Sequence, residues 1–216
     1  MVAGLGIAAV WLWGYAVPGT PTLTRRYLPT RVLARFGKVP GATPAPTGDP
    51  TEQLSALGVL RDDEPRLTPA FRETWTDTAA ALVESDRAMR QAAGEALAVP
   101  PGDVSVDANG GVELTVAGDW VGQWPSETAL VADLATELTL SDTGWSSIDR
   151  TVRADLAARI RGLAERCPVC EGPTRVSEDT VESCCGSADV IAVTCPDCTA
   201  RLVEFDPAPA AFAPGK

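Results

Sequence analysis

The spacing of hydrophobic residues between positions 51 and 166 alternates between the periods of a helix and a strand. Apolar residues three or four positions apart predict helices over 51–57, from Thr68 through Met89 to about Gly94, over 126–138, and from Ser146 or Ser147 to Leu163. Alternating valines and leucines around residues 109–111 (Asn-Gly-Gly) predict a β-hairpin, which Trp120 and Trp124 extend to a third strand. We expect one α+β domain over 51–166.

The segment 167–206 shows the pattern of a small, three-stranded β-module. Strands are predicted over 180–184, 189–193 and 202–205, with a turn at Gly186-Ser187 between the first two. The last predicted helix of the preceding domain runs directly into Cys167. The module should therefore be rigidly attached, while the core of the helical domain is expected to lie elsewhere.

The N-terminus carries a different pattern, an uncharged apolar run over 2–17 that ends in Trp11, Trp13 and Tyr15. As a helix it would be about 24 Å long, short for a span of about 20 residues. Five positive charges and no acidic residue follow over 18–48. Because aromatic residues favour the membrane interface and positive residues stay in the cytoplasm, the pattern predicts a membrane anchor with the body facing the cytoplasm.

Three alternatives to the anchor remain open: a buried core helix in a cytoplasmic protein, an interfacial segment, and a secretory signal. A signal peptide would carry a basic segment before its apolar run, which is absent here. Residues 18–50 are interpreted as a basic juxtamembrane segment followed by a linker rich in proline and glycine. Residues 207–216 are expected to form a flexible tail.

Composition adds a strongly acidic charge balance. The 216 residues include 29 acidic and 18 basic side chains, for a net charge of -11, and only Lys38 and Lys216 are lysines. Dense surface carboxylates keep a protein hydrated and self-repelling in strong salt. This acidic, lysine-poor composition is typical of a halophile, with an ordinary acidic protein of a GC-rich bacterium as the alternative.

Six cysteines, all between residues 167 and 198, provide the most specific chemical signal. Two Cys-Pro-x-Cys motifs place Cys167 with Cys170 and Cys195 with Cys198, separated by 24 residues. Such spacing predicts a zinc ribbon in which four thiolates complete a tetrahedron around Zn²⁺. Four protein ligands leave no position for water, so the metal should be structural. Metal binding should then supply much of the folding free energy of this module.

Other interpretations of the cysteines are disulfides, a redox-active pair, or an iron site. A redox-active motif normally opens a helix after a strand, a context that both motifs lack. An iron site of the rubredoxin kind has an aromatic core, but 167–206 contains only Phe205. Cys184 and Cys185 stand outside the ligand spacing; we interpret them as structural residues, with a ligand or redox-responsive thiol as the alternative.

The charge of the module argues against binding to nucleic acid. Residues 167–206 carry eight acidic residues and two arginines, a net charge of -6, whereas affinity for nucleic acid rests largely on basic contacts to phosphate. We therefore expect a protein partner. No small-molecule substrate is identified, and the chain has no histidine, no phosphate-binding glycine loop and no paired nucleophile and base, so an enzyme is not predicted.

Several segments together resemble a group of uncharacterised haloarchaeal proteins: residues 16–24 (AVPGTPTLT), 26–29 (RYLP), 71–75 (FRETW), the Cys-Pro-Val-Cys motif and 181–185 (VESCC). The resemblance covers most of the chain and implies no activity. Residues 57–68 are also similar to the end of a winged-helix domain, which gives a DNA-binding regulator as an alternative function. The main hypothesis is a membrane-tethered, zinc-binding structural or protein-interaction module.

Overall fold

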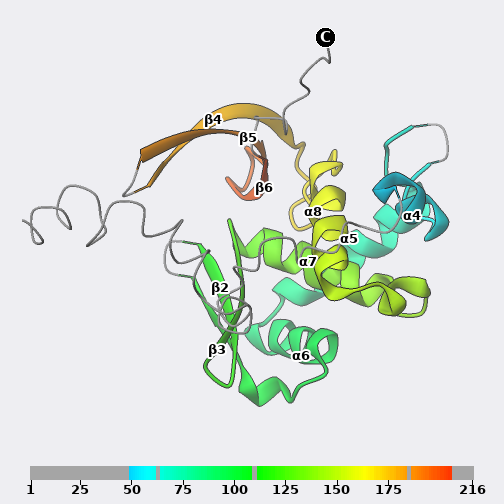
Figure 1. The fold of residues 1–216 in the computed structure, drawn as a ribbon, viewed down its shortest axis with the longest axis vertical. Helices are drawn as coiled ribbons and strands as arrows, with labels where there is room; N and C mark the ends of the chain where they lie inside the picture. Colours follow the sequence, from blue (N-terminus) through cyan, green and yellow to red (C-terminus); the bar gives the residue numbers. More distant parts are fainter. Residues whose placement is uncertain (1–48, 62–63, 109–110, 184–185, 206–216) are drawn as a thin grey trace, which may run out of the picture. The chain divides into compact units, whose positions relative to one another are not determined.

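The computed structural model describes residues 49–61, 64–108, 111–183 and 186–205. Within these ranges the fold is α+β, as expected, with five α-helices and two three-stranded antiparallel sheets (Figure 1). The predicted apolar helix over 2–17, the basic linker, Cys184, Cys185 and the C-terminal tail all lie outside the described residues.

The central segment contains most of the helices. Its elements are α4 (Pro50–Ala56), α5 (Pro69–Val83), α6 (Asp86–Leu97), the 3₁₀ turn η1 (Pro101–Asp103), β1 (Val104–Asp107), β2 (Val112–Val116), β3 (Asp119–Trp124), α7 (Glu127–Thr139), the 3₁₀ turn η2 (Gly144–Ser147) and α8 (Arg150–Gly162). The second sheet follows, with β4 (Arg175–Ser183), β5 (Gly186–Thr194) and β6 (Arg201–Phe205).

Side-chain caps define where the helices begin, and they correct two predictions. The single helix predicted from Thr68 to about Gly94 is two helices, because the Ser85 hydroxyl accepts the N–H of Ala88 and starts α6. Likewise Asp149, rather than Ser146 or Ser147, caps α8 by accepting the N–H of Thr151. The helical spacing of apolar residues continues across Ser85 and across Asp149, so this spacing does not indicate where one helix ends and the next begins.

The first sheet has the predicted hairpin and third strand, in the order β1-β2-β3. Val106 pairs with Leu114, and Leu114 pairs in turn with Gly122. The register then shifts, since Thr115 lies opposite Trp120 and leaves Val121 as the extra residue of a β-bulge. Trp120 is exposed on β3, an edge strand of this sheet.

The second sheet has longer strands than the pattern predicted. β4 and β5 pair over nine residues each, from Arg175 opposite Thr194 to Ser183 opposite Gly186. Gly186-Ser187 therefore begins a strand instead of forming the predicted turn. β6 pairs with only the last part of β5, so the outer part of the β4–β5 hairpin extends beyond the third strand (Figure 1).

One hydrophobic core connects the helices with the second sheet. At its centre the Trp75 indole of α5 donates to the Ala132 carbonyl at 2.9 Å and to the Thr136 hydroxyl of α7 at 3.0 Å. The same cluster includes Val193, Leu202 and Val203 from β5 and β6. The expectation that the helical domain has its core elsewhere is therefore wrong.

Two contacts between the helices and β6 explain this shared core. The Ser126 hydroxyl, which caps α7, also donates to the carbonyl of Arg201 at 2.7 Å. Gly162 at the end of α8 faces the ring of Phe205, and an added Cβ would come within 3.0 Å of it. The absence of a side chain at Gly162 thus allows β6 to approach α8 closely.

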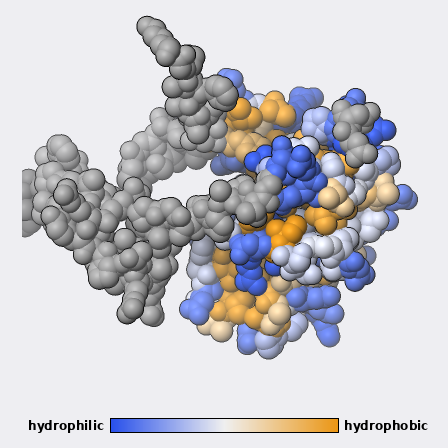
Figure 2. Space-filling view, turned by 45° about the vertical axis from the view of Figure 1, so that its right-hand side comes forward, coloured by the Kyte–Doolittle hydropathy of each residue, from blue (hydrophilic) through white to orange (hydrophobic). Residues whose placement is uncertain are grey.

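The described residues include no helix that is both long enough and apolar enough to cross a bilayer. Their surface mixes hydrophilic and hydrophobic residues on the face drawn in Figure 2. The largest exposed apolar side chains are Val83, Trp120, Val176 and Phe205. The segments on which the prediction of an anchor is based, residues 2–17 and 18–48, lie outside the described residues.

Candidate metal centre

The two cysteine motifs fold into turns of the same local geometry. In each, the N–H of the first cysteine donates to the carbonyl five residues later: Cys167 to Gly172 at 2.8 Å and Cys195 to Ala200 at 2.9 Å. The residue after each second cysteine has a left-handed backbone, with φ of 57° at Glu171 and 58° at Thr199. Both turns therefore curl back on themselves and direct two thiols to one side.

The β4–β5 hairpin explains why the two turns meet. Cys170 and Cys195 are separated by 24 intervening residues, but β4 leads away from the first turn and β5 returns to the second. Arg175 at the start of β4 lies opposite Thr194 at the end of β5. Antiparallel pairing thus places the two motifs side by side.

The four sulfur atoms of Cys167, Cys170, Cys195 and Cys198 all lie within 4.8 Å of one another. Cys170 and Cys195 are 3.5 Å apart, and Cys167 and Cys198 are 3.8 Å apart. A tetrahedral site with metal–sulfur bonds of about 2.3 Å requires sulfur–sulfur distances of about 3.8 Å, whereas a disulfide requires about 2.05 Å. The four cysteines are positioned to hold a metal ion, and all four are those selected by the sequence spacing.

The four thiols differ in burial and in the direction of their pKa shifts. Cys167 and Cys195 are buried, while Cys170 and Cys198 are exposed. Burial raises the pKa of the Cys167 thiol to about 12. Burial also opposes ionisation of Cys195, but backbone N–H groups of Cys198 and Asp197 and the neighbouring thiols outweigh it and lower the pKa of Cys195. A bound cation would favour the thiolate form at all four positions.

A close approach between the turns involves residues that the sequence did not single out. A Cβ added at Gly172 would come within 2.9 Å of the Cβ of Asp197 and still closer to its carboxylate. Gly172 thus lets the second turn pack directly against the first. In the sequence, only the position of Gly172 two residues after Cys170 pointed to a role near the metal site. The contact with Asp197 could not be predicted, because the two residues are far apart in sequence.

A second polar cluster lies between α7, α8 and the first sheet. The Asp133 carboxylate accepts a hydrogen bond from the Trp124 indole at 2.7 Å and pairs with the Arg161 guanidinium at 3.3 Å. Desolvation raises the pKa of Asp133 to about 6, although Arg161 and Trp124 both oppose the shift. In the sequence, this cluster is indicated only by the charge of Asp133 within segment 130–135, whose other residues are leucine, valine and alanine.

Comparisons with known proteins identify a family over most of the chain. The chain matches the N-terminal domain of a family of unknown function, DUF8054, over residues 1–39, its central domain over 49–162 and its C-terminal domain over 165–205. No curated protein matches the chain. No solved structure matches it either.

Proposed function

We propose that this chain, which belongs to the family of unknown function DUF8054, is a protein-interaction module whose C-terminal ribbon is built around one structural Zn²⁺ ion. The observation that carries the proposal is the convergence of four cysteine sulfurs within 4.8 Å. Four thiolates occupy all positions of a tetrahedral ion and leave none for substrate or water. The metal would then stabilise the fold rather than perform chemistry.

The aromatic content of the ribbon favours zinc over iron. Tetrahedral four-thiolate sites accept both metals, but iron sites of the rubredoxin kind have an aromatic core. Phe205, the one aromatic residue of the ribbon, instead directs its ring at Gly162 of α8. The ribbon therefore has apolar contacts with the helices and no aromatic shell that would favour iron.

Elemental analysis of the purified protein tests the metal. We expect one zinc per chain, lost in Cys170→Ser and Cys195→Ser because each removes a ligand. Cys184→Ser and Cys185→Ser are the matched controls and should keep one zinc. Loss of zinc from Cys184→Ser with retention in Cys195→Ser would overturn the ligand assignment, and iron in place of zinc would overturn the choice of metal.

The negative charge of the ribbon supports a role in binding another protein. The ribbon carries a net charge of -6 from its sequence, and a divalent ion with four thiolates would add two further negative charges. This surface suits a protein partner better than nucleic acid. Cross-linking in cells followed by mass spectrometry tests this; recovery of DNA with the protein at low salt would favour the DNA-binding alternative.

We further propose that residues 2–17 attach the protein to the membrane with its body in the cytoplasm. The support is the uncharged run with three aromatic residues at its end, followed by five basic residues over 18–48. Fractionation of full-length protein and of a variant without residues 1–48 tests the proposal. Recovery of the full-length protein in the soluble fraction contradicts it.

A further inference from the structure

Two close sulfur pairs of the candidate metal centre each join an exposed cysteine with a buried one. Cys170 is exposed and lies 3.5 Å from the buried Cys195. Cys198 is exposed and lies 3.8 Å from the buried Cys167. Both pairs connect the first turn with the second, so each thiol that solvent reaches has a shielded partner on the opposite turn.

This arrangement meets the two requirements of reversible thiol oxidation. A thiolate that a peroxide can reach is converted to a sulfenic acid, and a neighbouring thiolate then displaces hydroxide from it to form a disulfide. Cys170 provides the accessible sulfur, and Cys195 provides the neighbouring one. Their separation has to fall only from 3.5 Å to the about 2.05 Å of a disulfide.

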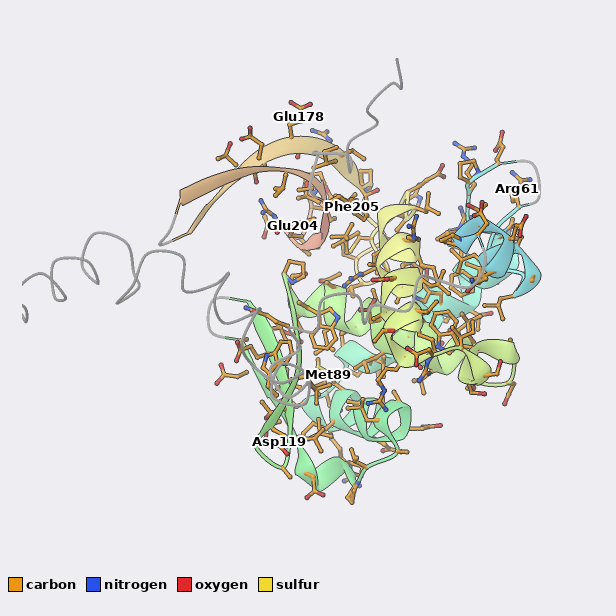
Figure 3. All side chains as sticks on the ribbon, in the orientation of Figure 1. Arg61, Met89, Asp119, Glu178, Glu204 and Phe205 are labelled. Atoms are coloured by element: carbon orange, nitrogen blue, oxygen red, sulfur yellow. The ribbon has the colours of Figure 1, made fainter. Side chains whose placement is uncertain are left out.

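The charge around the pair favours a neutral oxidant. Glu171 and Asp197, the sequence neighbours of the two exposed cysteines, are themselves exposed. Glu178 of β4 and Glu204 of β6, both labelled in Figure 3, are further exposed carboxylates of the ribbon. A zinc ion with four thiolates would add to this negative charge. Because like charges repel, the surface disfavours anionic oxidants, whereas hydrogen peroxide is uncharged and approaches without this cost.

We propose that Cys170 is a site of reversible oxidation by hydrogen peroxide and that the product is a disulfide with Cys195. The inference rests on the proposed structural zinc, since oxidation of two ligands would release the ion. In the first step the Cys170 thiolate attacks one peroxide oxygen, so that an S–O bond forms, the O–O bond breaks and hydroxide leaves. In the second step the Cys195 thiolate attacks the Cys170 sulfur, and the hydroxyl group leaves as a second hydroxide. The two thiolates thus supply the two electrons that reduce the peroxide, and both hydroxides take up protons to become water.

A disulfide between the turns explains why the oxidation is reversible. The bond keeps the two motifs side by side after the ion is lost, as the pairing of Arg175 with Thr194 also does. A thiol reductant regenerates both thiolates by exchange, and the four ligands can then bind zinc again. A disulfide within one motif is typical of motifs that open a helix, which neither motif here does.

Release of zinc from purified, zinc-loaded protein in millimolar hydrogen peroxide tests the proposal. Elemental analysis first establishes one zinc per chain, and a chromogenic chelator then follows the free ion. Trypsin cleaves after Arg166, Arg175 and Arg201, so a disulfide between the turns links peptide 167–175 to peptide 176–201. We expect this linked pair of peptides to accumulate at the rate of zinc release. Treatment with a reductant and zinc should restore one zinc per chain.

A second digestion after acidic residues identifies the two cysteines of the bond. Cleavage after Asp189 and Asp197 isolates peptide 190–197, in which Cys195 is the single cysteine. Fragmentation of the partner peptide in the mass spectrometer distinguishes Cys170 from Cys167. We expect the bond to join Cys170 with Cys195.

Two histidine variants test which exposed cysteine reacts with peroxide. Cys170→His and Cys198→His each leave three cysteines and one histidine, a ligand set that also holds structural zinc. Cys170→His lacks the thiolate that attacks peroxide and should release zinc at least about tenfold more slowly than the unmutated protein. Cys198→His is the matched control, because it keeps Cys170 and Cys195, and should release zinc at the rate of the unmutated protein.

Three results would overturn the proposal: a disulfide within 167–175 or with any cysteine other than Cys195, equal rates of zinc release in the two histidine variants, or failure to rebind zinc after reduction. If a histidine variant does not hold zinc, the peptide map of the unmutated protein decides. Protein that contains no zinc when purified refutes the proposed function. Zinc-loaded protein that keeps its zinc in peroxide refutes the oxidation site alone.

Discussion

Removal of the metal should loosen helices α7 and α8 as well as the ribbon. Val193, Leu202 and Val203 are 3, 0 and 4% exposed and share one core with the helices. Full burial of an aliphatic side chain contributes about 1.5–3 kcal/mol, so these three together contribute about 5–9 kcal/mol. This amount is comparable with the whole stability of a domain, about 5–15 kcal/mol.

Hydrogen exchange measured by mass spectrometry on zinc-loaded and chelated protein tests this coupling. If the ribbon folds around zinc as proposed, removal of the ion should take away its main source of folding free energy, and β6 should then leave the surface that α7 and α8 present to it. We expect exchange in peptides from 127–139 and 150–162 to accelerate at least about tenfold, which corresponds to about 1.4 kcal/mol. Helix α6 should change less, because its neighbours are α5, α7, η1 and β1.

A variant that keeps all cysteines provides a matched measurement. Leu202→Ala should lower the free energy of unfolding by about 2–5 kcal/mol, because Leu202 is fully buried in the shared core, and should retain one zinc per chain. If chelation exposes residues 167–205 to full exchange while α7 and α8 keep their protection, the ribbon has a separate core and the reasoning is refuted.

Three further predictions concern single residues. Folding raises the pKa of Asp133 to about 6, so the contribution of this group to stability is fully present below about pH 4 and is lost as the pH rises through 6. In chemical denaturation, the free energy of unfolding of the unmutated protein should fall by up to about 3 kcal/mol relative to that of Asp133→Asn between pH 4 and 7. A constant difference between the two proteins over this range would contradict the assignment. Gly172→Ala should weaken zinc affinity in a competition assay with a chromogenic chelator, since the added Cβ meets Asp197; Gly102→Ala, where nothing lies within 4 Å, should leave it unchanged. Trp75→Phe removes two buried hydrogen bonds from one donor and should lower the free energy of unfolding by about 1–3 kcal/mol in urea denaturation, whereas a loss below about 0.5 kcal/mol would show that these bonds contribute little.

Local chemistry explains why the sequence alone selected the four cysteines that are positioned to hold a metal ion. A Cys-Pro-x-Cys motif brings two thiols together within one turn, and this geometry depends on few residues outside the motif. Hairpin chemistry around residues 109–111 and the helical spacing of apolar residues are equally local, so β1, β2, α5 and α7 were predictable. Breaks such as the one at Ser85 were not, because apolar spacing continued across them.

Contacts between distant residues were decided only by the tertiary structure. The apolar residues Leu202 and Val203 predict a strand beside a hydrophobic core, but their spacing does not say against which element they pack, and the predicted ribbon had no core in common with the helices. The pairing of Asp133 with Arg161 joins two helices, and the approach of Gly172 to Asp197 joins two turns. A sequence pattern gives the periodicity of an element and the chemistry of a motif, whereas the partner of each apolar face and each buried charge depends on how the elements pack.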